Sequence, residues 1–435
     1  MLRVLLAFGL VISASHAFAE NRIDGQRPDA PELAAYGAMK VGVTSVEVTN
    51  PGQINILAID PAKPKPDPLP VYDRKLTVEI WYPAMADATG STELKAFIRD
   101  GKTEVTLHGQ AMRDAAVAEG RWPLVIISHG YPGNRFLLSH LAENLASKGY
   151  VVASIDHRDS TYRDKSAFGS TLVNRSLDQL FVLDQMAAID AGDGPLKGRI
   201  DTDTTAIIGY SMGGYGAIIT AGGGVTEAAV GYPWGGPHGT LGIHLSGSET
   251  HNALPDPRVK TAVAFGPWGL TYGFWNAETL KGVGIPMLFI AGSVDDISGY
   301  DPGIRSIWQA TASVDRALLT YVNANHNAGA PYPAPEEGRE VDPDLGFAPY
   351  DHYADAVWDT TRMNNIAQHF VTAWLGHYLK GEEDKAAFLD LVPDSNDSVW
   401  AVEDDGKNKP EHNHWAGFQE RTAKGLKFEW LRAPK

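Results

Sequence analysis

One serine in this sequence has the neighbours that a reactive serine needs. Ser211 lies in the run Gly209-Tyr-Ser-Met-Gly213, which follows a short apolar stretch and precedes small and apolar residues. This pattern predicts a strand, a sharp turn and a helix, with Ser211 at the apex of the turn. Glycines two residues before and after the serine fit such a turn, because strand and helix pass close together there. We therefore expect a nucleophile at Ser211; the alternative is a glycine-rich turn with only a structural role.

A serine hydroxyl is a weak nucleophile until a base removes its proton, and that base is usually a histidine oriented by a carboxylate. After a turn of this kind, the acid and the histidine follow later strands, in that order. Asp295 and His326 each come shortly after an apolar run that predicts a strand. We expect them to complete a catalytic triad with Ser211, and Asp296 is the alternative acid.

The reaction of such a triad passes through a negatively charged oxygen that needs fixed hydrogen-bond donors. One donor is normally the backbone N–H after the nucleophile, here that of Met212. The other comes from a loop after an earlier strand, and Tyr131, which follows His129-Gly130, is the candidate. His129 itself is expected to be a structural hydrogen-bonding residue. The run Asp156-His-Arg-Asp159 also follows a strand, and its charges are expected to pair with one another and brace that loop.

The elements that must position these residues alternate between strands and helices. Apolar runs of strand length predict buried parallel strands over 123–128, 150–155, 259–265, 285–291 and 316–322. Apolar residues at helical spacing predict helices over 136–148, 172–191 and 365–379. The sequence therefore predicts an α/β fold, with a mainly parallel central sheet and helices on both faces.

The chain of 435 residues divides into segments of different character. A basic start, an apolar centre and an Ala-Phe-Ala ending predict an export signal over residues 1–19. We expect an extended lead over 20–75, one α/β domain over 76–380 and a C-terminal extension over 381–435. Residues 222–258 are an irregular insertion in the domain, interpreted as a lid or as a surface loop without a role.

The composition excludes several classes of function. The net charge is −16 and no basic patch stands out, so nucleic acid and anionic membranes are not expected partners. There is no cysteine, which excludes disulfides and a thiol nucleophile. No later apolar run reaches the ~18 residues of a membrane span. Glu411-His412-Asn-His414 is expected to be solvated, so neither a metal ion nor a cofactor is expected. We expect a periplasmic or secreted mature protein.

Three motifs together resemble the α/β-hydrolase superfamily over roughly residues 76–380. Ile127-Ser-His-Gly130, Asp156-His-Arg-Asp159 and Gly209-Tyr-Ser-Met-Gly-Gly214 are similar to the platelet-activating-factor acetylhydrolase branch and to dienelactone-hydrolase-like esterases. The third motif, followed by Phe265-Gly-Pro-Trp268, is also similar to secreted polyester hydrolases and cutinase-like enzymes. True dienelactone hydrolases differ in using a cysteine nucleophile.

The resemblance implies the α/β-hydrolase fold, the triad Ser211, Asp295 and His326, and an oxyanion hole at Tyr131 and Met212. It also implies a substrate contact at Trp268, the alternative being a core aromatic residue. The expected function is that of an exported serine hydrolase cleaving carboxylic esters, whether short-chain, aromatic or polymeric, through an acyl-enzyme. Alternatives are a phospholipid deacetylase like the platelet-activating-factor acetylhydrolases, a peptidase of the same fold and a non-catalytic binding protein.

Overall fold

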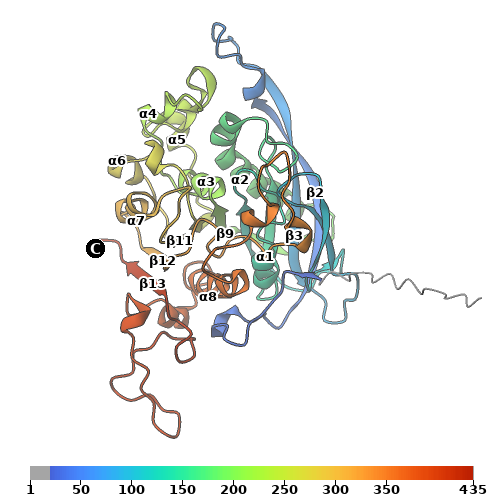
Figure 1. Cartoon of the computed structure of the whole chain (residues 1–435). Helices are drawn as coiled ribbons and strands as arrows, with labels where there is room; N and C mark the ends of the chain where they lie inside the picture. The colour runs from blue at the N-terminus through green and yellow to red at the C-terminus, as the bar shows by residue number, and fades with distance from the viewer. Residues whose placement is uncertain (1–19, 435) are drawn as a thin grey trace, which may run out of the picture.

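The structure, a computed structural model, describes residues 20–434 (Figure 1). These residues form the strands β1 (Asn21–Arg22), β2 (Lys40–Ile54), β3 (Val71–Ala84), β4 (Glu93–Phe97), β5 (Glu104–His108), β6 (Met112–Arg113), β7 (Trp122–Ser128), β8 (Val151–Asp156), β9 (Ile200–Tyr210), β10 (Val259–Phe265), β11 (Met287–Gly292), β12 (Arg316–Tyr321) and β13 (Leu426–Leu431). The main sheet has the order β13-β12-β11-β10-β9-β7-β8-β3-β2-β6. Strands β7 to β12 run parallel, while β3 and β13 are antiparallel to their neighbours. The predicted mainly parallel sheet is confirmed.

Helices cover both faces of this sheet (Figure 1). They are α1 (Ser139–Ala146), α2 (Phe168–Ala191), α3 (Met212–Thr220), α4 (Glu227–Val230), α5 (Glu249–Asn252), α6 (Ala277–Leu280), α7 (Arg305–Ala310) and α8 (Thr360–Tyr378). Alternate residues of β7 show the two layers, because successive side chains of a strand point to opposite faces. Val125 and Ile127 belong to the core that contains α1 and α8. Leu124 and Ile126 belong to the core that contains α2 and α3.

The sheet extends beyond the expected domain limits of 76 and 380 at both ends. Strand β2, within the segment expected to be an extended lead, pairs with β3 along most of its length. Strand β13, within the C-terminal extension, pairs with β12 and forms one edge of the sheet. Most residues of β2 are partly buried or exposed, and in β13 buried residues alternate with partly buried ones. They therefore lack the continuous apolar run that marks the central strands in the sequence.

Two further parts of the chain lie around the main sheet. Strands β1, β5 and β4 form a small second sheet. The insertion 222–258 contains α4 and α5 and lies near α6 at one end of the molecule (Figure 1). No helix within residues 20–434 is long and apolar enough to cross a membrane. The expected export signal, residues 1–19, lies outside the described residues.

Candidate active site

Ser211 lies at the apex of the turn between β9 and α3, as the sequence predicts. Its φ of 54° and ψ of −112° are rarely adopted by a residue with a side chain. A Cβ on Gly209 would collide with the backbone of Gly213, and a Cβ on Gly213 would collide with the carbonyl of Ser128. The two glycines therefore allow the tight turn, which places Ser211 in the wall of a cavity of about 560 Å³.

The carboxylate of Asp295, shortly after β11, hydrogen-bonds to the histidine that follows β12. Its Oδ2 lies 2.8 Å from Nδ1 of His326. Its Oδ1 accepts the backbone N–H groups of Ile297 at 3.0 Å and Ser298 at 2.8 Å. Burial opposes ionisation of Asp295, but the His326 hydrogen bond and charge and these N–H groups hold its pKa below the usual value. The carboxylate is thus ionised and fixes the orientation of the imidazole.

The alternative acid, Asp296, occupies a different position. It is exposed at the cavity, and its backbone N–H donates to the side chain of Asn325 at 3.0 Å. No hydrogen bond within residues 20–434 joins its carboxylate to His326, whereas that of Asp295 makes one. The structure therefore brings Asp295, rather than Asp296, to the histidine.

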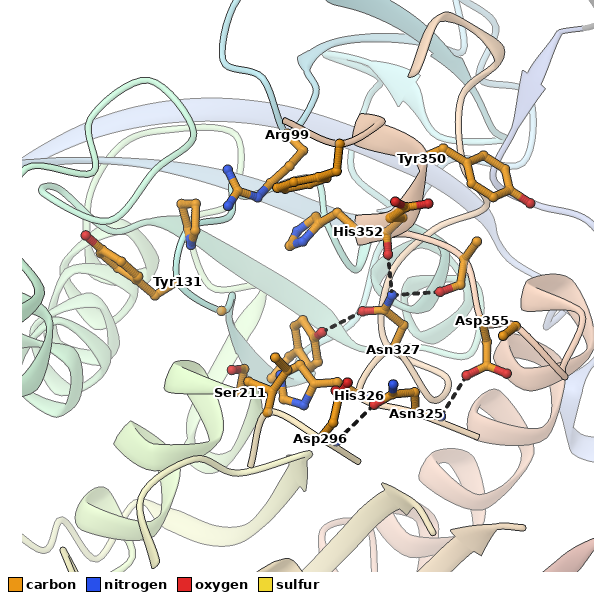
Figure 2. Close-up of a pocket in the computed structure, with 18 residues that line it drawn as sticks. Arg99, Tyr131, Ser211, Asp296, Asn325, His326, Asn327, Tyr350, His352 and Asp355 are labelled. Carbon is orange, nitrogen blue, oxygen red and sulfur yellow. Dashed lines mark hydrogen bonds between the residues drawn. The ribbon is translucent and has the colours of Figure 1, made fainter. Parts of the chain in front are cut away.

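Ser211 and His326 line the same cavity, and Figure 2 shows them next to each other. The His326 ring lies tilted against the ring of Tyr210, with the centroids 5.1 Å apart. A Cβ on Gly266 would lie only 3.2 Å from the imidazole, so the glycine leaves room for the ring. The structure thus brings together the serine, the histidine and the carboxylate that the sequence singles out.

The two expected oxyanion donors also lie at this end of the sheet. Met212 is the first residue of α3, and Tyr131 lies in the cavity wall. A Cβ on Gly130 would lie 3.2 Å from Cβ of Ser211, so the loop carrying Tyr131 passes close to the serine. Within residues 20–434, neither the N–H of Met212 nor that of Tyr131 hydrogen-bonds to another group. Both groups are available to a bound oxygen atom.

A buried arginine, which the sequence analysis missed, hydrogen-bonds to the backbone of the loop that carries Tyr131. Arg175 of α2 donates to the carbonyl of His129 at 2.9 Å and to that of Gly130 at 3.5 Å. In a trans peptide the N–H points opposite to the C=O, so a Gly130 carbonyl turned toward Arg175 directs the Tyr131 N–H away from it. Nε2 of His129 accepts the backbone N–H of His157 at 3.2 Å, which gives His129 the expected structural role.

Trp268, the expected substrate contact, is not among the residues that line the cavity. The side chain is 8% exposed and packs in an aromatic cluster. It stacks on Tyr272 with centroids 4.7 Å apart and meets Phe168, Tyr215 and Phe274 edge-on. The alternative interpretation, a core aromatic residue, describes its surroundings.

The insertion 222–258 also contributes no residue to the cavity lining. The cover comes from Arg99, just after β4, and from the segment 347–356, two regions that the sequence analysis did not connect with the site. Asn327 connects that segment to Tyr210, the residue before the serine. Its side chain accepts a hydrogen bond from the Tyr210 hydroxyl at 3.0 Å and donates to the carbonyl of Ala354 at 2.7 Å (Figure 2). Neither region has the apolar periodicity that identifies a helix or strand in a sequence.

The histidines near the C-terminus make local contacts. Both ring nitrogens of His414 have partners, Ser398 Oγ at 3.0 Å and the carbonyl of Gln419 at 3.1 Å. His412 packs edge-on against Trp400, with ring centroids 5.3 Å apart. No group of three or more His, Cys, Asp or Glu side chains within residues 20–434 is placed to hold a metal ion.

Comparison with solved structures identifies the fold. A ferulic acid esterase from Streptomyces cinnamoneus matches with a TM-score of 0.53 and 19% identity, over 81% of this chain and 94% of that one. The chain has the α/β-hydrolase fold. The resemblance stated from the motifs is confirmed at this level, while the platelet-activating-factor acetylhydrolase branch is not specifically supported.

Sequence comparisons agree with this fold. A family model described as PET hydrolase-like matches residues 109–240. The cutinase est1 of Thermobifida alba is 27% identical over 208 residues, 47% of this chain and 53% of the relative. The bis(hydroxyethyl) terephthalate hydrolase of Streptomyces coelicolor is 24% identical over 212 residues, 48% of this chain and 52% of the relative. The chain thus spans about half the length of the curated relatives it matches.

Proposed function

We propose that this protein is a serine hydrolase that cleaves carboxylic esters through an acyl-enzyme. One observation carries the proposal. The Asp295–His326 pair and Ser211, in its strained turn, meet in the wall of one cavity. Relatives named as cutinases and as a terephthalate diester hydrolase support esters as the substrate class. We extend the proposal to an exported enzyme, on the basis of the signal-like residues 1–19.

The reaction follows from the positions of these groups. Oγ of Ser211 attacks the ester carbonyl while Nε2 of His326 accepts the hydroxyl proton. Asp295, bound to Nδ1, stabilises the imidazolium that forms. The N–H groups of Tyr131 and Met212 donate to the oxyanion. His326 then returns the proton to the departing alcohol, and a water molecule, activated by the same histidine, releases the acid and regenerates Ser211.

The test combines a chemical label with a variant. A fluorophosphonate should label Ser211, and Ser211→Ala should lose both labelling and turnover of 4-nitrophenyl butyrate. We expect a fall in kcat of about 10⁴-fold or more, because removing the nucleophile of a triad costs this much. Near-ultraviolet circular dichroism should show an unchanged fold. A folded Ser211→Ala variant with full activity would reject the mechanism, and absence of labelling in the wild type would favour a non-catalytic binding protein.

A further inference from the structure

The cavity that contains Ser211 also contains a cation that forms no ion pair within the described residues. The guanidinium of Arg99 enters the cavity from the segment after β4 (Figure 2). Its Nη1 is buried and has no hydrogen-bond partner within residues 20–434. The guanidinium lies over the ring of Phe347, whose centroid is 5.7 Å from Cζ. A buried donor without an acceptor is costly, which indicates that this position is kept for a ligand.

A second polar atom without a partner faces the same space. Nε2 of His352 is buried and makes no hydrogen bond within residues 20–434. Burial, together with the charge of Arg99, lowers the pKa of His352 to about 3, so the ring is neutral. Its edge-on contacts with Tyr162 and Tyr353, at 5.5 and 5.2 Å, hold it in place. In the tautomer with a proton on Nε2, this ring adds a neutral donor beside the arginine.

None of the acidic residues that line the cavity forms an ion pair with Arg99 within the described residues. Both oxygens of Asp355 are used, since they accept the backbone N–H groups of Asn325, Val357 and Trp358 at 2.7 to 2.8 Å. Asp296 and Asp351 are exposed, and neither forms an ion pair with Arg99 within the described residues. Figure 2 shows Arg99 at the opposite end of the site from Asp296 and Asp355.

We propose that Arg99, with His352, binds a carboxylate on the substrate, so that the preferred substrates are half-esters of dicarboxylic acids. This inference rests on the proposed ester hydrolysis. A guanidinium presents paired donors that match a carboxylate, and a partly buried site strengthens that bond. The protein carries a net charge of −16, so an anion needs such a local cation to be retained. Tyr131, Tyr210 and Phe347 line the same cavity as Arg99 and Ser211, and aromatic walls of this kind suit a flat linker.

The test compares two methyl esters of nearly equal shape. Monomethyl terephthalate carries a carboxylate, and in methyl 4-carbamoylbenzoate a neutral amide replaces it. The wild type should prefer the carboxylate ester by about tenfold or more in kcat/KM. Arg99→Gln should bring this ratio close to one, mainly through a rise in KM for the carboxylate ester, and Arg99→Lys should give an intermediate ratio. A charge-assisted hydrogen bond of this kind accounts for about 10- to 100-fold in affinity.

Arg163→Gln is the matched control. Arg163 stacks on Phe97, at the end of β4, with Cζ 4.3 Å from the ring centroid, and it does not line this cavity. The variant should keep the wild-type ratio. A second measurement needs no variant: terephthalate should inhibit hydrolysis of the carbamoyl ester competitively, whereas terephthalamide should not.

The outcomes separate this inference from the proposed function. A wild-type ratio near one, or an equal loss of both esters in folded Arg99→Gln, would overturn the role of Arg99. In either case the wild-type protein would still cleave the carbamoyl ester, and the fluorophosphonate would still label its Ser211. Failure of both esters and of labelling would instead reject ester hydrolysis itself.

Discussion

In two places within residues 20–434 a serine lies beside a histidine that hydrogen-bonds to an aspartate. One is the candidate active site. The other, called the buried chain below, consists of two hydrogen bonds. Ser128, at the end of β7, bonds to Nε2 of His157 at 2.8 Å, and Nδ1 of His157 bonds to Asp178 of α2 at 2.8 Å. All three of these residues are at most 1% exposed. The side chain of His326, in contrast, is 12% exposed and lines the cavity.

The surrounding charges differ as much as the exposure does. Asp178 accepts Nε and Nη2 of Arg74 at 2.7 and 2.8 Å, and these bonds overcome burial to lower its pKa to about 2. Burial and the charge of Arg175 lower the pKa of His157 to about 3. Asp295 has no arginine partner within the described residues, and its remaining bonds come from backbone N–H groups. The order serine–histidine–aspartate therefore does not make a nucleophile; access and a histidine able to accept a proton are also needed.

Replacing each histidine in turn gives the largest contrast. His326→Asn should lower kcat by about 10⁴-fold or more, because it removes the proposed base. His157→Asn should lower kcat by no more than about tenfold while reducing the melting temperature, because that ring connects buried groups. Ester turnover and thermal melting, measured on the same preparations, check both expectations. An equal loss of kcat in a folded His157→Asn variant would show that the buried chain takes part in the chemistry.

The aspartate of the buried chain should contribute mainly to stability. Asp178→Asn breaks a buried ion pair with Arg74, and such a loss costs about 3–5 kcal/mol. Asp184→Asn, on the same helix α2, is the matched control. The Asp184 side chain is 63% exposed and pairs with Arg258, so its loss should cost less than about 1 kcal/mol. Urea unfolding at pH 7 measures both values, and similar costs for the two variants would contradict the assigned role.

The residues around the cavity differ in how well the sequence predicts their positions. Ser211, Asp295 and His326 each follow a buried strand, so a local pattern predicts the position of each at one edge of the sheet. The triad roles themselves stay a proposal. Arg99 and His352 come from irregular segments, and only tertiary packing brings them over the cavity.

The loop Asp156-His-Arg-Asp159 shows the same limit on a smaller scale. Its charges were expected to pair with one another, and this is wrong for most of them. Asp156 pairs with Arg135, while Asp159 pairs with Arg74 at 3.0 Å and approaches Arg158 only to 3.8 Å. Partners far apart in the sequence replace neighbours, because the buried carboxylates need donors that reach them inside the core.

The smallest expected effect is on the pH dependence of the free energy of unfolding, to which His157 of the buried chain contributes. The pKa of His157 is about 3 in the folded protein, against 6.5 for an exposed histidine. Between these values the unfolded chain binds a proton that the native protein does not, so the free energy of unfolding falls as the pH falls below 6.5. The contribution of one such group is about 1.4 kcal/mol per pH unit. His140 and His369, whose pKa values are also about 3, add slopes of the same sign.

Urea unfolding of the wild type and of His157→Asn between pH 6 and pH 5 measures this contribution. The free energy of unfolding should change less steeply with pH in the variant, by about 1.4 kcal/mol per pH unit. Equal slopes would mean that the pKa of His157 is not lowered in the folded protein.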